Sequence, residues 1–106
     1  MTPYVRAVLE KLRDLPTAAG RVRPADQRLA EQLESQGTPL ALVQGALHLA
    51  ALRRMLRPPG APPLPPIRSL AYVRPILDEL SNPRVDPGYL EHLEHRLARE
   101  IRRSRH

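Results

Sequence analysis

A block of prolines interrupts the middle of the chain and limits what the chain can fold into. Six prolines fall within the nine residues from Pro58 to Pro66. Because proline lacks a backbone N–H and holds φ near one value, this block cannot belong to a helix interior or to a central strand. Three interpretations are open: a flexible tether between two parts, a ligand for a partner protein, and a rigid strap inside one folded unit.

The segments on either side of the block favour the strap. Those after it offer only two narrow apolar stripes, too small to form a core by themselves, whereas the helix predicted before it has a broad apolar face that needs cover. We therefore predict that residues 58–66 form an extended, polyproline-like strap, rising roughly 3 Å per residue, that returns along this helix. Pro63 and Pro66 fit the P-x-x-P spacing of a docking peptide, but this spacing is almost unavoidable in so proline-rich a block.

The apolar residues available to a core are mostly aliphatic. The 106 residues include no Phe, no Trp and three Tyr, so Leu, Ala, Val and Ile must fill the interior. A scarcity of aromatic and β-branched residues favours packed helices over a sheet, and a chain of this length fits one domain. The sequence therefore predicts an all-α fold, a small five-helix bundle in one domain over residues 1–106.

Capping signals and apolar spacing locate the five helices. Thr2, Thr38 and Asp86 each precede a proline, a pattern typical of the start of a helix. Gly37 follows the second apolar stripe, at a position that commonly takes a left-handed conformation. The predicted helices span residues 3–15, 25–36, 39–57, 70–80 and 87–103.

Two of these helices carry further predictions. The segment 39–57 is apolar over most of its circumference, so we expect it to be the central helix. Ser69 can cap the helix at 70–80, and Pro75, which removes a backbone hydrogen bond inside that helix, predicts a kink. Both predictions concern how the second half of the chain packs onto the first.

Basic residues exceed acidic ones and gather in two clusters. The formal net charge is +6, an excess that favours anionic partners such as nucleic acid, acidic protein surfaces or anionic lipid. The alternative is an ordinary solvated surface with the arginine bias of a GC-rich genome, since sixteen of the seventeen basic residues are Arg. The clusters lie at the end of the predicted helix 39–57 and in the final segment. Their arginines are Arg53, Arg54, Arg57, Arg96, Arg99, Arg102, Arg103 and Arg105.

Several kinds of site are excluded by residues that the chain lacks. Without Cys there are no disulfides, no zinc–thiolate sites and no Cys nucleophile. The five glycines are scattered rather than gathered in a phosphate-binding loop. No apolar run approaches the roughly 20 residues that span a bilayer, and the N-terminal segment lacks the apolar stretch of a signal peptide. We therefore expect no cofactor, no membrane partner and a cytoplasmic location.

One cluster in the predicted last helix has residues that can bind a metal. His92 and His95 lie three residues apart on one helix face. The zincin pattern requires a four-residue spacing and a third ligand, and neither is present. The alternative that we favour is a solvated helix face with charge pairs such as Glu91–His95. We therefore expect no metal site and no catalysis by this chain.

Two common devices for recognising nucleic acid have weak support. Residues 27–54 follow the order helix, glycine turn, helix, but the alanine of the first helix precedes the turn glycine by seven residues rather than four, and the second helix is too apolar to lie in a groove. We expect an antiparallel helix pair within the core instead. Base stacking is also weakly supported, because Tyr4, Tyr72 and Tyr89 are each expected on an apolar stripe.

The stretches LAEQLESQGTPLALVQGALHLAALRR and PIRSLAYVRPILDEL form a familiar pattern. A helix ends in Gly, a second helix carries small and aliphatic residues, and a final segment matches at Ile67, Ser69, Tyr72, Val73 and Ile76. Over about half the chain, this pattern resembles the DnaD-like domains and related helical modules of replication-initiation proteins from phages, plasmids and mobile elements. The resemblance implies a helical module that contacts DNA or a replication or transposition partner without catalysing a reaction.

The sequence thus leaves two functions to compare. The first is a non-catalytic accessory DNA-binding module, associated with replication or mobile-element maintenance, whose arginine clusters contact phosphates. The alternative is a small adaptor that binds a larger nucleic-acid enzyme through an exposed helix face, which the excess of apolar helix surface favours. Salt-dependent binding to DNA would separate the first from the second.

Overall fold

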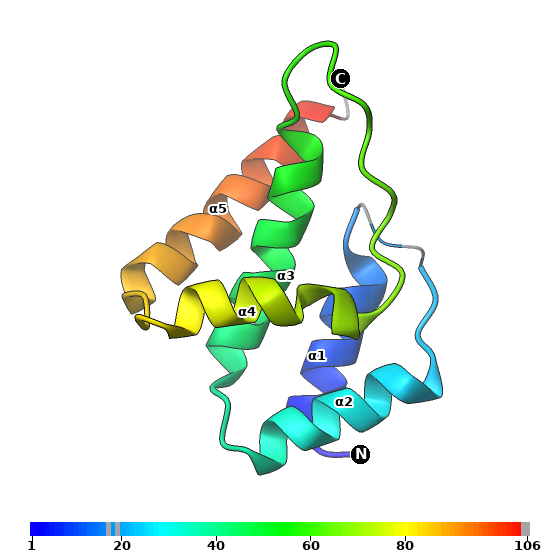
Figure 1. Cartoon of the computed structure of the whole chain (residues 1–106), viewed down its shortest axis with the longest axis vertical. Coiled ribbons are helices and arrows are strands. Elements are labelled where there is room, and N and C mark those ends of the chain that lie inside the picture. The colour runs from blue at the N-terminus through cyan, green and yellow to red at the C-terminus, as the bar shows by residue number, and fades with distance from the viewer. Residues whose placement is uncertain (17, 19, 105–106) are drawn as a thin grey trace.

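Five α-helices and one short 3₁₀ helix form the fold, seen in a computed structural model that describes residues 1–16, 18 and 20–104 (Figure 1). Within these ranges the chain contains no β-strand, so the prediction of an all-α, five-helix domain is confirmed. The helices in chain order are α1 (Pro3–Asp14), α2 (Pro24–Ser35), α3 (Leu40–Met55), the 3₁₀ helix η1 (Leu70–Val73), α4 (Arg74–Ser81) and α5 (Pro87–Ser104).

The ends of the first helices follow the capping signals at two of three predicted places. The Thr2 hydroxyl accepts a 3.1 Å hydrogen bond from the Val5 backbone N–H and so caps α1. Gly37 has a φ of 77° just beyond α2, as expected of a residue that ends a helix. Thr38 does not cap α3, because Pro39 takes the cap position. The Thr38 carbonyl instead accepts a 2.7 Å hydrogen bond from the Tyr4 hydroxyl.

The segment predicted as one kinked helix at 70–80 is two helices in the structure. Its first turn is the 3₁₀ helix η1, and α4 begins at Arg74, so Pro75 lies in the first turn of α4 and no kink follows from it. Proline is tolerated there because the first N–H groups of a helix have no partner within the helix. The Ser69 side chain makes no capping bond either. The buried Asp26 carboxyl accepts the Leu70 backbone N–H at 2.8 Å instead.

The central position of α3 is confirmed. It packs against α1, η1, α4 and α5, and in Figure 1 α4 crosses it while α5 runs beside it. Its buried residues lie around most of its circumference, which explains why it has no polar face. These residues are Leu42, Val43, Gly45, Ala46, Leu47, His48, Ala50, Ala51 and Leu52.

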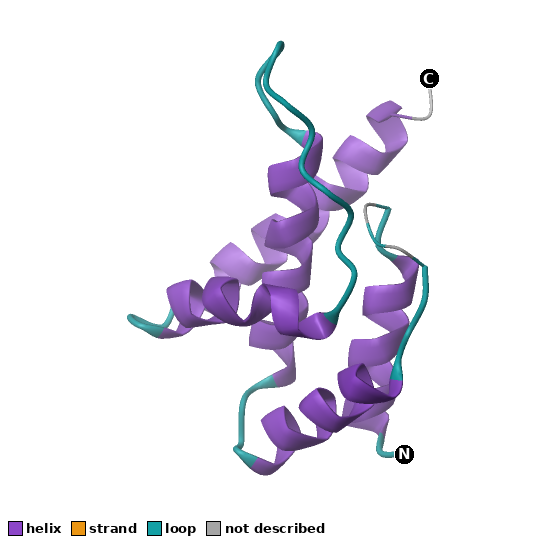
Figure 2. Ribbon diagram, turned by 45° about the vertical axis from the view of Figure 1, so that its right-hand side comes forward, coloured by secondary structure: helices purple, strands orange, loops and turns teal. Residues whose placement is uncertain are grey.

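The proline block is a strap, as predicted, although its first part is a turn. A bond from the Ala61 N–H to the Pro58 carbonyl, 3.1 Å long, closes this turn, and Gly60 there has a φ of 83°. From Pro62 to Pro66 the chain lacks regular secondary structure and returns along the molecule to η1 (Figure 2). The buried Ile67 then pairs with Ala18 in an isolated parallel bridge, so the strap ends against the loop that follows α1.

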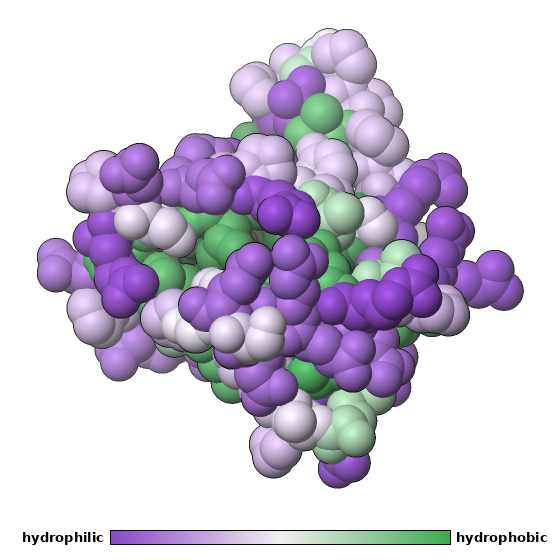
Figure 3. Space-filling model, turned by 60° about the horizontal axis from the view of Figure 1, so that its bottom comes forward, coloured by the Kyte–Doolittle hydropathy of each residue, from purple (hydrophilic) through white to green (hydrophobic). Residues whose placement is uncertain are grey.

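Hydrophilic side chains cover most of the face of the molecule seen in Figure 3. Hydrophobic side chains reach the surface there in hollows between the hydrophilic ones. Among the described residues, no helix combines the length and the apolar character that a membrane crossing requires.

Candidate nucleic-acid interface

Arg53, at the C-terminal end of α3, is joined to α4. Its guanidinium donates two hydrogen bonds to the Glu79 carboxylate, at 2.9 and 2.7 Å. This bonding raises the pKa of the Arg53 guanidinium and lowers the pKa of the Glu79 carboxyl. Both side chains are about half exposed, so the pair is a surface clamp between two helices rather than a buried one.

Arg54 and Arg57 are joined to the strap. Arg54 Nε donates to the Pro65 carbonyl at 2.8 Å, and its Nη1 donates to the Ala50 carbonyl at 3.0 Å. The same guanidinium lies 4.4 Å from the centre of the Tyr72 ring, a cation–π contact. Arg57 donates to the Pro62 carbonyl through Nε and Nη2. The three arginines at the end of α3 therefore already bind groups within the chain.

The arginines of α5 have a different environment. Successive residues of an α-helix turn by about 100°, which puts His95, Arg99 and Arg102 on the side opposite the buried Leu93 and Leu97. Arg96, Arg103 and His92 lie together on one flank of that side. All six basic residues are exposed, and the ion pair found among the described residues of α5 joins Arg103 to Glu100 at 3.5 Å. We call this set the basic stripe; its members are His92, His95, Arg96, Arg99, Arg102 and Arg103. The predicted contact residue Arg105 lies outside the described residues.

Two tyrosines are exposed, which corrects the expectation that each would lie on an apolar stripe. Tyr89 is 41% exposed and its ring stacks on the His92 ring, with centroids 6.3 Å apart and planes inclined by 29°. It lies at the edge of the apolar side of α5, towards Arg96. Tyr72 is 44% exposed because in a 3₁₀ helix of three residues per turn, Leu70 and Val73 point inward together and Tyr72 points out.

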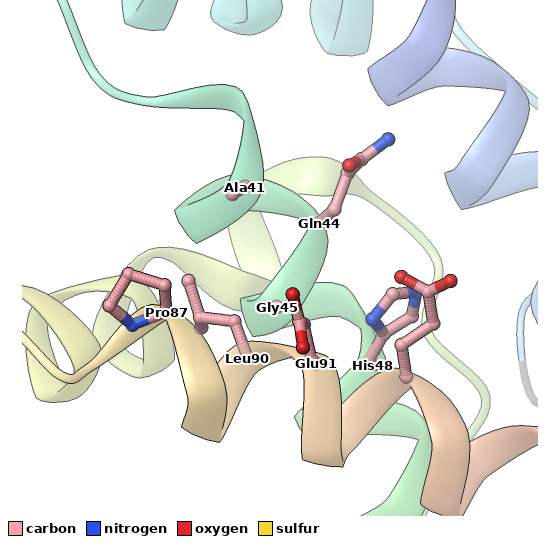
Figure 4. Close-up of a pocket in the computed structure, with 8 residues that line it drawn as sticks. Ala41, Gln44, Gly45, His48, Pro87, Leu90 and Glu91 are labelled. Carbon is pink, nitrogen blue, oxygen red and sulfur yellow. The ribbon is translucent and has the colours of Figure 1, made fainter.

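A small pocket lies between α3 and α5, with a volume of about 160 Å³. Figure 4 shows His48 and Gln44 from α3 and Glu91 from α5 around it. His48 is 3% exposed, and its Nδ1 has no hydrogen-bond partner among the described residues. Burial, with a smaller effect from Lys11, lowers the pKa of His48 to about 4, so this side chain is neutral at pH 7.

Gly45 lies where α3 meets α5 beside this pocket. A Cβ atom built at this position would lie 2.6 Å from Leu90 Cδ2, well inside van der Waals contact. A larger residue in place of this glycine would therefore require the flexible end of the Leu90 side chain to move.

The histidine pair of α5 was the strongest metal candidate in the sequence. Among the described residues, no three His, Cys, Asp or Glu side chains come together as a metal site would need. The His92 ring stacks on Tyr89, on the exposed face of α5, and His95 lies on the same face. Both histidines therefore belong to the surface of the basic stripe.

Sequence reasoning missed three features of this region. The hydrogen bond from the Leu70 N–H to the Asp26 carboxyl, across 44 residues, has no signal in the sequence. The pocket at His48 was not predicted either. The Tyr89–His92 stack does have a signal, because residues three apart lie on neighbouring parts of a helix surface.

Comparisons of the chain with protein-family models, with curated proteins and with solved structures find no match. The resemblance to DnaD-like domains therefore stays a prediction. The functional argument depends on the geometry of this chain.

Proposed function

We propose that this protein is a non-catalytic accessory DNA-binding module that contacts phosphates through the basic stripe of α5. The observation that carries the proposal is the gathering of four exposed arginines and two exposed histidines on the exposed side of α5, away from its buried leucines. A role in replication or mobile-element maintenance rests on the resemblance to DnaD-like domains.

The stripe fits sequence-independent binding. Arginine donates several hydrogen bonds from a planar, permanently charged group, which suits phosphate oxygens. Each phosphate that is neutralised releases counterions, so affinity falls as salt rises. Contacts from the four described arginines of α5 predict a slope of log affinity against log salt of about −3 to −4 on duplex DNA.

The proposal narrows the set of contact residues that the sequence predicted. Arg53, Arg54 and Arg57 bind Glu79 and the carbonyls of the strap, and a phosphate would have to compete with these bonds. We therefore assign them to the fold, and assign phosphate contact to Arg96, Arg99, Arg102 and Arg103.

A second candidate function is an adaptor for a larger nucleic-acid enzyme. It is favoured by an open groove of about 480 Å³ between the end of α3, the strap and α4. The groove combines apolar and charged side chains, and Leu64 and Tyr72 in it are both exposed. Solvent-exposed apolar side chains beside charged ones are typical of protein-binding surfaces.

Fluorescence anisotropy with a labelled 20-base-pair duplex at low salt tests the first function. We expect the triple change Arg96→Gln, Arg99→Gln and Arg103→Gln to weaken binding by about tenfold or more and to reduce the salt slope by about 2 to 3. The matched control changes three exposed arginines elsewhere on the molecule and so removes the same charge. These are Arg6, Arg28 and Arg68.

The control distinguishes a located site from bulk charge. We expect the control variant to bind within about threefold of the unaltered protein, since its arginines lie on α1, α2 and after the strap. Equal weakening by both triple variants, or absence of binding at micromolar protein, would reject the basic stripe as a DNA site. Co-purification with a nucleic-acid enzyme that is lost when residues of the groove are changed would then favour the adaptor.

A further inference from the structure

We propose that the preferred ligand of this surface is single-stranded nucleic acid, whose bases stack on the Tyr89–His92 pair while its phosphates follow the arginines of the basic stripe. This inference rests on the proposed function, because it uses the same face of α5. It adds a class of ligand, and it gives a role to an aromatic pair that phosphate binding to a duplex does not use.

The first step is the exposure of the aromatic pair. Tyr89 packs against His92 yet remains 41% exposed, at the N-terminal end of the stripe. A large aromatic side chain normally contributes most of its stabilising effect by burial. In a duplex the bases are stacked on one another, whereas in a single strand their faces are open to aromatic side chains.

The second step is the alignment of the pair with the arginines. Tyr89, His92, Arg96, Arg99 and Arg103 follow one another at intervals of three or four residues, so they form one continuous row on the helix. At a rise of 1.5 Å per residue, the row is about 21 Å long. A row with an aromatic end and a cationic remainder matches the combination by which proteins hold single strands without reading sequence.

The third step is a second exposed aromatic side chain beside an arginine. Arg54 covers one face of Tyr72, and this tyrosine remains 44% exposed on the wall of the open groove beside the strap. Tyr72 is therefore a second exposed ring held against an arginine, the same combination of groups as on α5.

The chemistry on this surface favours a single strand over an anionic membrane. A membrane-binding helix inserts large apolar side chains beside its basic residues. The exposed side of α5 instead carries Tyr89, His92, His95 and Glu91 with the arginines, and Leu93 and Leu97 are buried in the core. Aromatic rings that lie on a helix surface beside arginine match nucleobases, which have flat faces of similar size.

The experiment compares three labelled ligands by fluorescence anisotropy at one salt concentration: a twelve-nucleotide oligothymidylate, an abasic strand of equal length, and a twelve-base-pair duplex. We expect the unaltered protein to bind the oligothymidylate about tenfold more tightly than either of the others, since base stacking is removed in both. Tyr89→Leu should weaken oligothymidylate binding by about tenfold and leave the abasic strand and the duplex unchanged. Tyr89→Phe keeps the ring and should bind like the unaltered protein.

A second readout reports stacking directly. The chain has three tyrosines and no tryptophan, so its intrinsic fluorescence comes from tyrosine. We expect the oligothymidylate to quench this emission in the unaltered protein, and to quench it less in Tyr89→Leu. Circular dichroism checks that the leucine variant is folded, and Tyr4→Phe, which alters a partly buried tyrosine of α1, serves as a matched control.

The outcomes separate this inference from the proposed function. Equal affinity for all three ligands, or a Tyr89→Leu variant that weakens all of them alike, would overturn base stacking and leave phosphate binding by α5 in place. Loss of oligothymidylate binding in the Arg96, Arg99 and Arg103 variant, together with the tyrosine effect, supports both. If phosphatidylserine vesicles bind tightly and no nucleic acid does, both the inference and the proposed function fail.

Discussion

The strap side and the α5 side of the molecule differ in whether their polar side chains have hydrogen-bond partners within the chain. On the strap side, Asp26 accepts two backbone N–H groups, from Arg23 at 2.8 Å and from Leu70 at 2.8 Å. There Arg54 and Arg57 donate to strap carbonyls. On the α5 side, the arginines of the basic stripe face solvent, and His48 is buried with an unpaired Nδ1 among the described residues.

This contrast teaches that a cluster of arginines in a sequence has no single meaning. An extended strap of prolines offers carbonyl acceptors but few N–H donors, so it needs donors from elsewhere in the chain. The arginines at the end of α3 supply them. Among the described residues, the arginines of α5 make no bond to a strap carbonyl, and Arg103 alone pairs with a carboxylate, that of Glu100 at 3.5 Å. Their exposed side chains can therefore be reached by a ligand.

Removing Asp26 should have the largest effect on the strap side. Asp26→Ala leaves the buried Leu70 N–H without its acceptor and also removes the bond from the Arg23 N–H, so we expect the free energy of unfolding to fall by about 3 kcal/mol. Urea denaturation followed by circular dichroism measures it. Asp86→Ala, at an exposed carboxyl before α5, serves as a control with an expected loss below about 1 kcal/mol. Similar losses in both variants would contradict the anchoring role of Asp26.

Acid should act mainly through His48, on the α5 side. Its pKa is lowered by burial from 6.5 to about 4 in the folded state, so between these values the unfolded chain binds the proton first. The contribution of neutral His48 to the free energy of unfolding is therefore complete above pH 6.5 and is lost as the pH falls towards 4, with about 2 kcal/mol lost by pH 4.5.

The measurement compares urea unfolding at pH 7 and pH 4.5 in the protein and in His48→Gln. The glutamine variant should lose about 2 kcal/mol less stability on acidification, because it has no group to protonate at this position. His95→Gln, at an exposed position of α5, should retain the pH dependence of the unaltered protein. If His48→Gln also retains it, the buried histidine does not cause it.

Replacing one arginine by alanine on each side compares the strap side with the α5 side directly. These changes should have the smallest effects on the free energy of unfolding. Arg54→Ala removes two hydrogen bonds to carbonyls and the contact with Tyr72, so we expect the protein to lose about 1 to 2 kcal/mol of stability. Arg99→Ala, from the basic stripe, should change stability by less than about 0.5 kcal/mol. Urea midpoints give both values, and equal losses would mean that the two clusters do not differ as described.

Much of the fold could be predicted from the sequence, because the helix ends and the buried helix faces depend on residues close together in the chain. Threonine or aspartate followed by proline marked the starts of α1 and α5, and Gly37 marked the end of α2. The apolar circumference of α3 identified it as the central helix, because burial on all sides needs neighbours on all sides. These features depend on residues within a turn or two of one another.

What the sequence did not contain depends on distant partners. The split into η1 and α4 accompanies the capture of the Leu70 N–H by Asp26, 44 residues earlier. The two arginine clusters look alike in sequence, and they differ because Glu79 and the strap carbonyls lie near only one of them. Periodicity placed Tyr89 on the apolar side of α5, but it lies at the edge of that side and is 41% exposed.

The strap also affects how copies of the protein behave side by side. The unpaired N–H and C=O groups of an exposed, extended backbone can form hydrogen bonds with the backbone of a neighbouring chain. Here four of the five residues from 62 to 66 are prolines without an amide hydrogen, and the carbonyls of Pro62 and Pro65 are occupied by Arg57 and Arg54. The strap therefore offers another backbone few groups to pair with. Copies of the protein bound close together on one nucleic acid can stay separate at this surface.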